Sequence, residues 1–137
     1  MAYNGVELIS ISIKHSVANV TLYPKGGETT TVDGGGLVTD DDTGANTGSG
    51  EPIYKMTNKR WKIEAPPVAW DRGLNDTLLD LQAIQQSFEE AVFSFSFADG
   101  YILKCKGRIV SELKGAILDA TIPMIFSGGG KIERIRV

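Results

Sequence analysis

The sequence of 137 residues contains one cysteine, Cys105, and one histidine, His15. A single cysteine excludes an internal disulfide, and a single histidine excludes metal sites built from several imidazoles. Any catalytic pair that needs a histidine base would have to use His15, which follows a predicted strand and is interpreted as an ordinary turn or surface residue. Cys105 falls on the apolar face of a predicted strand, so we expect a buried, unreactive thiol.

Long apolar runs and catalytic motifs are also missing. No stretch approaches the ~20 apolar residues of a membrane-spanning helix, and residues 1–5 lack the basic and apolar regions of a signal peptide. We therefore expect a protein without a membrane partner, made and kept in a reducing cytoplasm. The segment 128–131 lacks the first glycine and the Ser/Thr of a phosphate-binding loop, and no Gly-x-Ser-x-Gly motif is present. The sequence thus predicts no enzyme, no cofactor and no metal.

The composition is that of an ordinary globular protein, with 42% apolar and 23% charged residues. A chain of this length can bury a sizeable core, and we predict one domain over residues 1–137. The net charge of −3 conceals an asymmetry: residues 1–50 hold six acids and two lysines, and the remainder holds eleven acids and twelve bases. The acidic first part argues against a simple nucleic-acid-binding surface.

A helix is predicted from about residue 76 to 88. Its apolar positions recur every three or four residues, at Leu74, Leu78, Leu81, Ile84 and Phe88. Asn75, Asp76 and Thr77 are all favourable N-cap types, and Thr77 with Asp80 fits a loose capping box. Because so short a helix is unstable alone in water, we expect it to pack on a sheet.

A hairpin follows directly. Residues 91–97 alternate apolar and serine side chains, which is typical of a half-buried strand. A two-residue loop would place Phe95 opposite Lys104, whereas the three-residue loop 98–100 places it opposite Leu103. Only the second register gathers the apolar side chains on one face, so the sequence predicts it. The opposite, wet face then carries Ser94, Ser96, Ile102, Lys104 and Lys106.

Further strands are expected at residues 6–13, 17–23, 28–32, 53–63, 116–126 and 131–137. In the first of these, Ile9, Ile11 and Ile13 share the buried face. Residues 107–113 are expected to continue the second strand of the hairpin, with a kink or bulge at Gly107. Pro66-Pro67 is predicted to end the strand 53–63, and Pro123 to mark an edge or a bend. Because strands dominate and one helix interrupts them, the predicted fold class is a mainly β protein, a β-sandwich or barrel with one flanking α-helix.

The segment 33–50 differs in kind from the rest. It contains six glycines and three consecutive aspartates, and its only apolar pair is Leu37-Val38. Such a segment cannot build a core, and ordering it costs about 1–2 kcal/mol per residue. We predict a long glycine-rich loop that is loose in the monomer and becomes ordered against a partner. The candidate subunit-interface residues are Leu37, Val38, Asp40, Asp41 and Asp42.

Calcium binding is a first alternative for this loop. Asp40 and Asp42 imitate the start of a calcium-binding loop, but Gly44 occupies the third ligand position and no glutamate closes the ring. A solvated acidic loop is therefore the preferred interpretation.

Binding of single-stranded nucleic acid is a second alternative. Basic and aromatic residues interleave at Tyr54, Lys55, Lys59, Arg60, Trp61 and Lys62. Any strand with one core face and one wet face gives the same pattern, and Trp61 and Ile63 fit a core face. We therefore favour an ordinary strand.

The order of these features resembles that of the tail tube proteins of tailed bacteriophages, in particular those with contractile tails. The shared features are an N-terminal strand pair, the acidic glycine-rich loop ending Thr47-Gly48-Ser49-Gly50, Arg60-Trp61-Lys62-Ile63, Trp70-Asp71, the leucine-rich helix, Ala98-Asp99-Gly100, Gly107-Arg108-Ile109-Val110, Ala120-Thr121-Ile122-Pro123 and the segment 128–132. The resemblance spans residue 30 to the end of the chain and depends on the ordered set of features.

The resemblance implies assembly without catalysis. Members of that family form hexameric rings that stack into a hollow tail tube, through which DNA passes without specific binding. The implied partners are further copies of the chain and the tail sheath, baseplate and tail terminator proteins, and the implied location is the virion tail. A long loop reaches a neighbouring subunit or ring.

The same resemblance gives the wet strand face a candidate role. Strand faces of this kind line the channel of the tube, so Ser94, Ser96, Lys104 and Lys106 form a candidate lumen or polar-interface face. A channel that lets DNA slide should avoid lysines that hold phosphate, so a contact of Lys104 and Lys106 with another subunit stays open. Two other functions also stay open: a related ring component of a baseplate or secretion system, and a monomeric β-sandwich that binds a ligand or carbohydrate.

Overall fold

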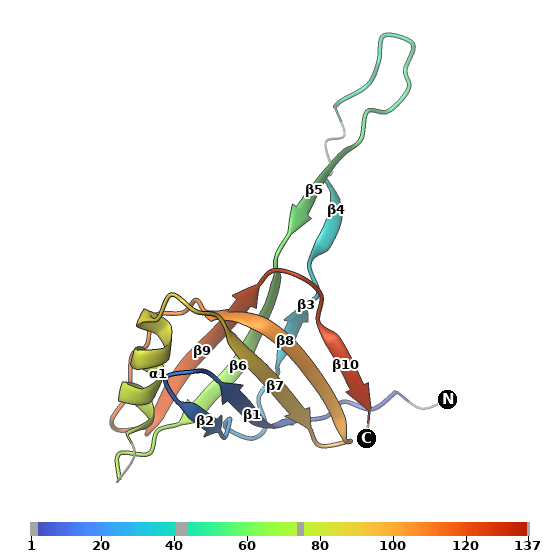
Figure 1. The fold of residues 1–137 in the computed structure, drawn as a ribbon. Helices are drawn as coiled ribbons and strands as arrows, with labels where there is room; N and C mark the ends of the chain where they lie inside the picture. The colour runs from blue at the N-terminus through green and yellow to red at the C-terminus, as the bar shows by residue number, and fades with distance from the viewer. Residues whose placement is uncertain (1–2, 41–43, 74–75, 137) are drawn as a thin grey trace.

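The computed structural model describes residues 3–40, 44–73 and 76–136, which form ten strands and one helix (Figure 1). The elements are β1 (Leu8–Lys14), β2 (Asn19–Leu22), β3 (Thr31–Asp33), β4 (Gly36–Asp40), β5 (Lys55–Lys59), β6 (Trp61–Ala69), α1 (Thr77–Gln86), β7 (Ala91–Phe97), β8 (Tyr101–Ile109), β9 (Thr121–Gly128) and β10 (Glu133–Arg136). The predicted fold class is confirmed: the protein is mainly β, with antiparallel sheets and one flanking helix.

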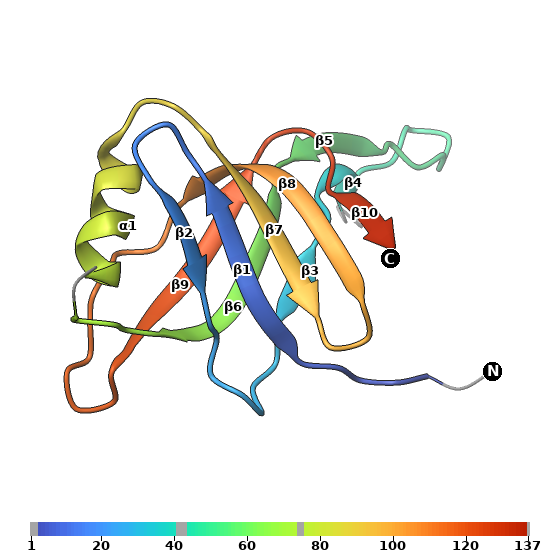
Figure 2. The same ribbon diagram turned by 60° about the horizontal axis from the view of Figure 1, so that its bottom comes forward.

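Two layers of strands share one member, β8. The strand order is β2-β1-β7-β8-β9-β6-β3, and β10 adds to β8. β8 pairs along one edge with β7; its other edge pairs with β10 through Tyr101 to Lys104 and with β9 through Arg108 and Ile109. One layer therefore contains β2, β1, β7, β8 and β10, and the other contains β8, β9, β6 and β3 (Figure 2).

The hairpin of β7 and β8 has the predicted register. Phe95 lies opposite Leu103 and Phe93 lies opposite Cys105, so the connection is the three-residue loop 98–100. Gly100 has a φ of 86°, the left-handed conformation that this loop needs and that glycine adopts without steric cost.

The core between the two layers is built around aromatic side chains. The ring of Phe93 lies 4.9 Å from that of Phe126 and 6.5 Å from that of Trp61, with edge-to-face geometry in both pairs. Phe95 lies 5.2 Å from Phe126, also edge to face. All four side chains are fully buried, and such pairs contribute about 0.5–1.5 kcal/mol beyond the burial of their area.

Gly107 makes close contact between the layers possible. A Cβ atom at this position would lie 2.4 Å from the carbonyl oxygen of Ser127 and 2.8 Å from the Trp61 ring. Gly107 pairs regularly with Ala91 of β7, so the strand has no kink there. Glycine is required because the layers approach too closely for a side chain.

The helix α1 ends earlier than predicted. It spans Thr77–Gln86 and buries Leu81 and Ile84. Gln85 donates hydrogen bonds to the carbonyl oxygens of Ile109 and Ser111, at 3.2 and 2.8 Å. These contacts hold the helix against the end of β8.

The helix differs from its prediction in its N-cap and in its last turn. Asp76 is the N-cap, so a capping box that begins at Thr77 is wrong. Ser87 turns into an extended conformation, and Phe88 beyond it is 99% exposed, so its place in the buried stripe is wrong too. Leu74 and Asn75 lie outside the described residues.

The capping of α1 predicts a pH-dependent stability. A hydrogen bond from the Trp70 indole N–H, at 3.0 Å, and others from Leu78 and Leu79 lower the pKa of Asp76 below its usual value of 3.8. A carboxylate whose pKa is lowered on folding stabilises the folded state above its unfolded pKa, and this stabilisation is lost as the pH falls through the folded pKa.

We therefore expect Asp76→Asn to be less stable than the wild type at pH 7, with a difference that shrinks steadily below pH ~4. Asparagine keeps the capping oxygen but carries no charge. Urea unfolding of both proteins at several pH values measures the difference. An equal difference at pH 7 and pH 2.5 would contradict this account.

Three prolines share one irregularity in the sheet. Ala65 pairs with Met124 and Val68 with Ile122, so Pro66 and Pro67 together lie opposite the single residue Pro123. This is a β-bulge, where ladder hydrogen bonds are already missing and proline costs little. The prediction that Pro66-Pro67 ends the strand is wrong, because β6 continues to Ala69. Pro123 lies opposite this bulge, in a part of β9 beyond the residues 126 and 127 that pair with β8.

A second irregularity changes the buried face of β1. The register shifts between Leu8 and Ser10. As a result Leu8 is buried and Ile9 is 54% exposed, whereas Ile11 and Ile13 are buried as predicted. The other strands match their expected positions only in part: residues 116–120 form a turn before β9, and β2 and β3 cover four and three residues.

Candidate functional site

A two-stranded arm projects from the body of the protein (Figure 1). We define the arm as residues 36–59: strands β4 and β5 and the segment between them. The two strands pair antiparallel from Gly36 opposite Lys59 to Asp40 opposite Lys55, and neither pairs with another strand of the described chain. Beyond the strands, Asn46 bridges to Pro52 and Thr47 accepts a backbone hydrogen bond from Gly50.

The arm corrects the expectation of an unstructured loop over residues 33–50. Residues 36–40 form a strand because residues 55–59 supply its partner. Sequence reasoning assigned those partner residues to a long core strand over 53–63. In the structure β5 ends at Lys59 and β6 begins at Trp61, so the first half of the expected strand belongs to the arm and the second half to the core.

The pairing of β4 with β5 sorts the side chains of the arm onto two faces. Side chains of directly opposed residues share a face, so Leu37 and Asn58 lie with Thr39 and Met56. Leu37 is 68% exposed and Met56 57% exposed. We call these two side chains the apolar face of the arm. Val38, on the other face with Thr57, is exposed as well.

The described candidate interface residues thus do not all share one face of the arm. Leu37 and Val38 lie on opposite faces of the arm, and Asp40 ends β4 opposite Lys55. Asp41 and Asp42, which the calcium alternative requires, lie outside the described residues. Elsewhere in the described chain, no group of three or more His, Cys, Asp or Glu side chains could hold a metal ion.

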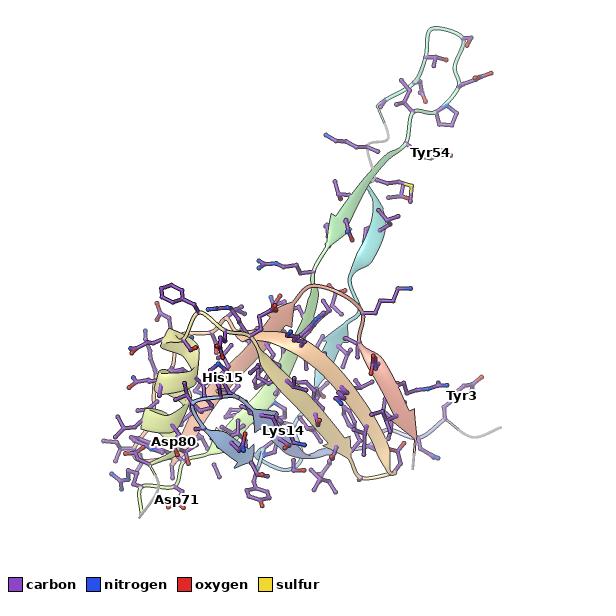
Figure 3. All side chains as sticks on the ribbon, viewed as in Figure 1. Tyr3, Lys14, His15, Tyr54, Asp71 and Asp80 are labelled. Carbon is purple, nitrogen blue, oxygen red and sulfur yellow. The ribbon has the colours of Figure 1, made fainter. Side chains whose placement is uncertain are left out.

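The arm contains apolar side chains that the sequence prediction missed. Met56, Ile53 and Tyr54 are all more than half exposed, and Tyr54 stands on the arm, away from the body (Figure 3). They were assigned to a core strand. Leu37 and Val38 can form a strand only with a partner strand. A search for that partner in the sequence could have placed Met56, Ile53 and Tyr54 on the arm.

The base of the arm is fixed by Gly35. Its φ is 67°, and a Cβ atom there would lie 2.6 Å from the carbonyl oxygen of Lys59 and 2.7 Å from the backbone of Arg60. Asp33 accepts a hydrogen bond from the Gly35 N–H at 3.1 Å. The chain therefore leaves β3 through a tight, glycine-specific turn against the junction of β5 and β6.

The structure brings together the four residues of the candidate lumen or polar-interface face. Ser94 lies opposite Lys104, Ser96 opposite Ile102 and Val92 opposite Lys106, so all these side chains share one face of the layer. Both lysines are exposed and both serines are half-buried. On the next strands, Glu133 lies opposite Lys104 and Ser12 lies opposite Ser94.

The stacking surface proposed for single-stranded nucleic acid is not continuous. Trp61 is fully buried and donates its indole N–H to the carbonyl oxygen of Gly129 at 3.2 Å. Tyr54 lies on the arm, whereas Arg60 lies at its base. The interleaved pattern therefore combines exposed residues of the arm with the core face and the wet face of β6.

His15 is buried, which corrects its interpretation as a surface residue. Its Nδ1 accepts a hydrogen bond from the Val17 N–H at 3.0 Å, so Nε2 carries the proton and donates to the carbonyl oxygen of Glu89 at 3.1 Å. Figure 3 places His15 within the body. Both ring nitrogens are used in connecting the β1–β2 turn to the segment before β7, which is a structural role.

Cys105 is 4% exposed, and burial raises the pKa of its thiol to about 12. Because the thiolate is the reactive form, we expect native Cys105 to react with a thiol reagent at pH 8 on the order of 10³-fold more slowly than the unfolded chain. Absorbance with a disulfide reagent, with and without urea, measures both rates. Fast labelling of the native protein would contradict the prediction.

Neither a membrane-spanning helix nor a known relative helps to define the site. In the described part of the chain, no helix has the length and apolar character needed to cross a membrane. A scan against models of known protein families and a search of curated proteins both returned no match.

Proposed function

We propose that this chain is a structural subunit that assembles with further copies of itself into rings, and that the rings stack into a hollow tube. The observation that supports this most is the arm. A two-stranded ribbon on its own is marginally stable in water, and this one exposes Leu37 and Met56 instead of burying them. Both features are accounted for if a neighbouring subunit covers the arm.

The edges of the sheet support the same proposal. Among the described strands, β2 and β3 end the strand order and each pairs on one side only. Unpaired edges present free N–H and C=O groups to a neighbouring chain. An arm that contacts a different surface on the next copy forms a heterologous contact, which gives a closed ring or an open filament.

The details of the proposed assembly follow from the resemblance to tail tube proteins. It comprises hexameric rings, contacts with sheath, baseplate and tail terminator proteins, a place in the virion tail, and passage of DNA through the channel. The face formed by Ser94, Ser96, Lys104 and Lys106 is proposed either to line that channel or to contact a neighbouring subunit. The proposed role requires no catalytic residue and no cofactor.

One observation favours a second candidate, a monomeric binding module. An apolar groove of about 400 Å³ is lined in part by Phe97 and Tyr101, and pockets that bind small ligands have similar volumes. A binding module would use this groove for a ligand and would stay monomeric.

Negative-stain electron microscopy with light scattering at several protein concentrations distinguishes the two candidates. Rings or hollow tubes of uniform width would support the assembly proposal. A mass equal to that of one chain at every concentration would contradict it and favour the binding module.

A further inference from the structure

The turn before β9 presents two adjacent apolar side chains to water. Ile117 is 64% and Leu118 98% exposed. Asp119 follows them and is the one charged residue between residues 115 and 127. We call residues 117–119 the apolar tip. Neighbouring exposed apolar side chains form a patch of the kind that binds another protein, whereas single ones are common on any surface.

Hydrogen bonds fix the apolar tip on the body. Ala116 and Thr121 exchange two backbone hydrogen bonds, of 2.9 and 3.3 Å, and the Ala120 N–H donates to the carbonyl oxygen of Ile117 at 3.3 Å. The Trp70 backbone N–H donates to the carbonyl oxygen of Ala120 at 2.7 Å. Ala120 has a φ of 52°, a left-handed conformation that is unfavourable for a residue with a side chain. A turn held in this way loses little conformational entropy when it binds a partner.

The apolar groove lies on the other side of the body. Its walls include Val32 of β3, Tyr101 and Leu103 of β8, and Ile132, and Arg134 of β10 is the one charged side chain among the described residues that line it. Arg134 lies directly opposite Leu103 in the pairing of β10 with β8, so the two side chains share a face. In both ribbon views β10 lies on the right of the body and the turn before β9 on the left (Figures 1 and 2).

The apolar tip and the groove are complementary in shape and in charge. The tip projects two apolar side chains followed by a carboxylate, and the groove combines apolar walls with a guanidinium. Its volume of about 400 Å³ is within the range of pockets that enclose whole small ligands, so it has room for two side chains. Within the described part of the chain, neither Asp119 nor Arg134 takes part in an ion pair.

We propose that the groove of one copy receives the apolar tip of the next copy, with Asp119 against Arg134. Because the two surfaces lie on opposite sides of one chain, this contact is heterologous and repeats in one direction, as the contacts within a closed ring do. The inference rests on the proposed function, because it requires copies to associate. It adds a contact made by the body of the protein, separate from any contact of the arm.

A charge exchange tests the ion pair. Asp119→Arg and Arg134→Asp each place like charges together, so each variant alone should need about a tenfold higher concentration for assembly. An equal mixture of the two should assemble near the wild-type concentration, because every copy then meets the opposite charge at both of its contacts. Mixing would not repair a merely structural defect. Glu90→Arg, at another exposed acid, is the matched control and should assemble as the wild type does.

Crosslinking between two separately prepared variants tests the apolar part. One carries Leu118→Cys; the other carries a mass tag and Val6→Cys, at a 42% exposed position that lines the groove. Cys105 stays in place, because a buried thiol reacts slowly. After mixing and treatment with a short bis-maleimide, we expect a crosslinked product of the two variants. Leu79→Cys, at a 61% exposed position of α1, replaces Leu118→Cys as the matched control and should not link to Val6→Cys.

The outcomes separate this inference from the proposed function. Tubes that form without the Leu118→Cys to Val6→Cys crosslink would overturn the inference and leave the proposed function standing. Normal assembly of Asp119→Arg and Arg134→Asp, each on its own, would overturn the ion pair in the same way. Absence of wild-type assembly at every concentration would overturn both.

Discussion

Replacing residues 37–58 by Asn-Gly should give a folded monomer that no longer assembles. Gly36 and Lys59 are directly opposed at the base of the arm, and a two-residue Asn-Gly turn connects opposed strands of a hairpin. β4 and β5 pair only with each other among the described strands, so the core should be unaffected. The loss of assembly should be complete, because the variant has no arm to place on a neighbour.

Circular dichroism and thermal unfolding check the fold of this variant, and light scattering with electron microscopy checks assembly. A milder variant, Leu37→Lys with Met56→Lys, keeps the arm and changes only its apolar face; it should also stay monomeric. Leu79→Lys, at a 61% exposed position of α1, is the matched control for a surface leucine and should assemble normally. Tubes formed by the variant without the arm would disprove the role of the arm.

Phe93→Ala should lower the free energy of unfolding by about 3–5 kcal/mol, the usual cost of removing a buried phenylalanine. Phe93 is fully buried, and its ring contacts those of Trp61, Phe95 and Phe126. Alanine leaves a cavity where the two layers meet, and the surrounding rings can fill it only in part. Urea unfolding followed by tryptophan fluorescence measures the change.

Phe88→Ala is the matched control, because it makes the same substitution at a side chain that is 99% exposed. Surface changes of this kind alter stability by less than about 0.5 kcal/mol. If the two variants were equally destabilised, the packing around Phe93 would not be the reason for its cost. A loss below 1 kcal/mol for Phe93→Ala would contradict its central place in the core.

The sequence alone predicted an element correctly where its residue pattern allowed only one arrangement of buried and exposed side chains. The register of β7 and β8 follows from three phenylalanines that must face apolar partners, and the structure has that register. The same alternation placed Ser94, Ser96, Lys104 and Lys106 on one face. The leucine spacing predicted the helix. Its end was predicted too late, because Ser87 is extended where the chain turns toward β7.

The sequence was insufficient where long-range pairing decided the outcome. Residues 33–50 carry no strand pattern of their own, and only the partner strand 55–59 makes residues 36–40 extended. Pro66-Pro67 was predicted to end a strand and Pro123 to mark an edge or a bend, because proline interrupts a ladder. All three meet at one bulge. His15 looked exposed because its partner, the backbone at Glu89, is 74 residues away.

Because the arm leaves the body at the tight turn of Gly35, a small rotation at this turn displaces the more distant residues of the arm by a larger amount. The strand β4 runs from Gly36 to Asp40, so it alone reaches on the order of 13 Å from the base of the arm. A tilt of about 10° at the base would shift the end of β4 by roughly 2 Å. If neighbouring copies are joined through the arm, the helical twist and axial repeat of the whole assembly are set at this one backbone position. We would then expect Gly35→Ala to change the pitch of the tube. Substitutions near the far end of the arm would change only the affinity between neighbouring copies.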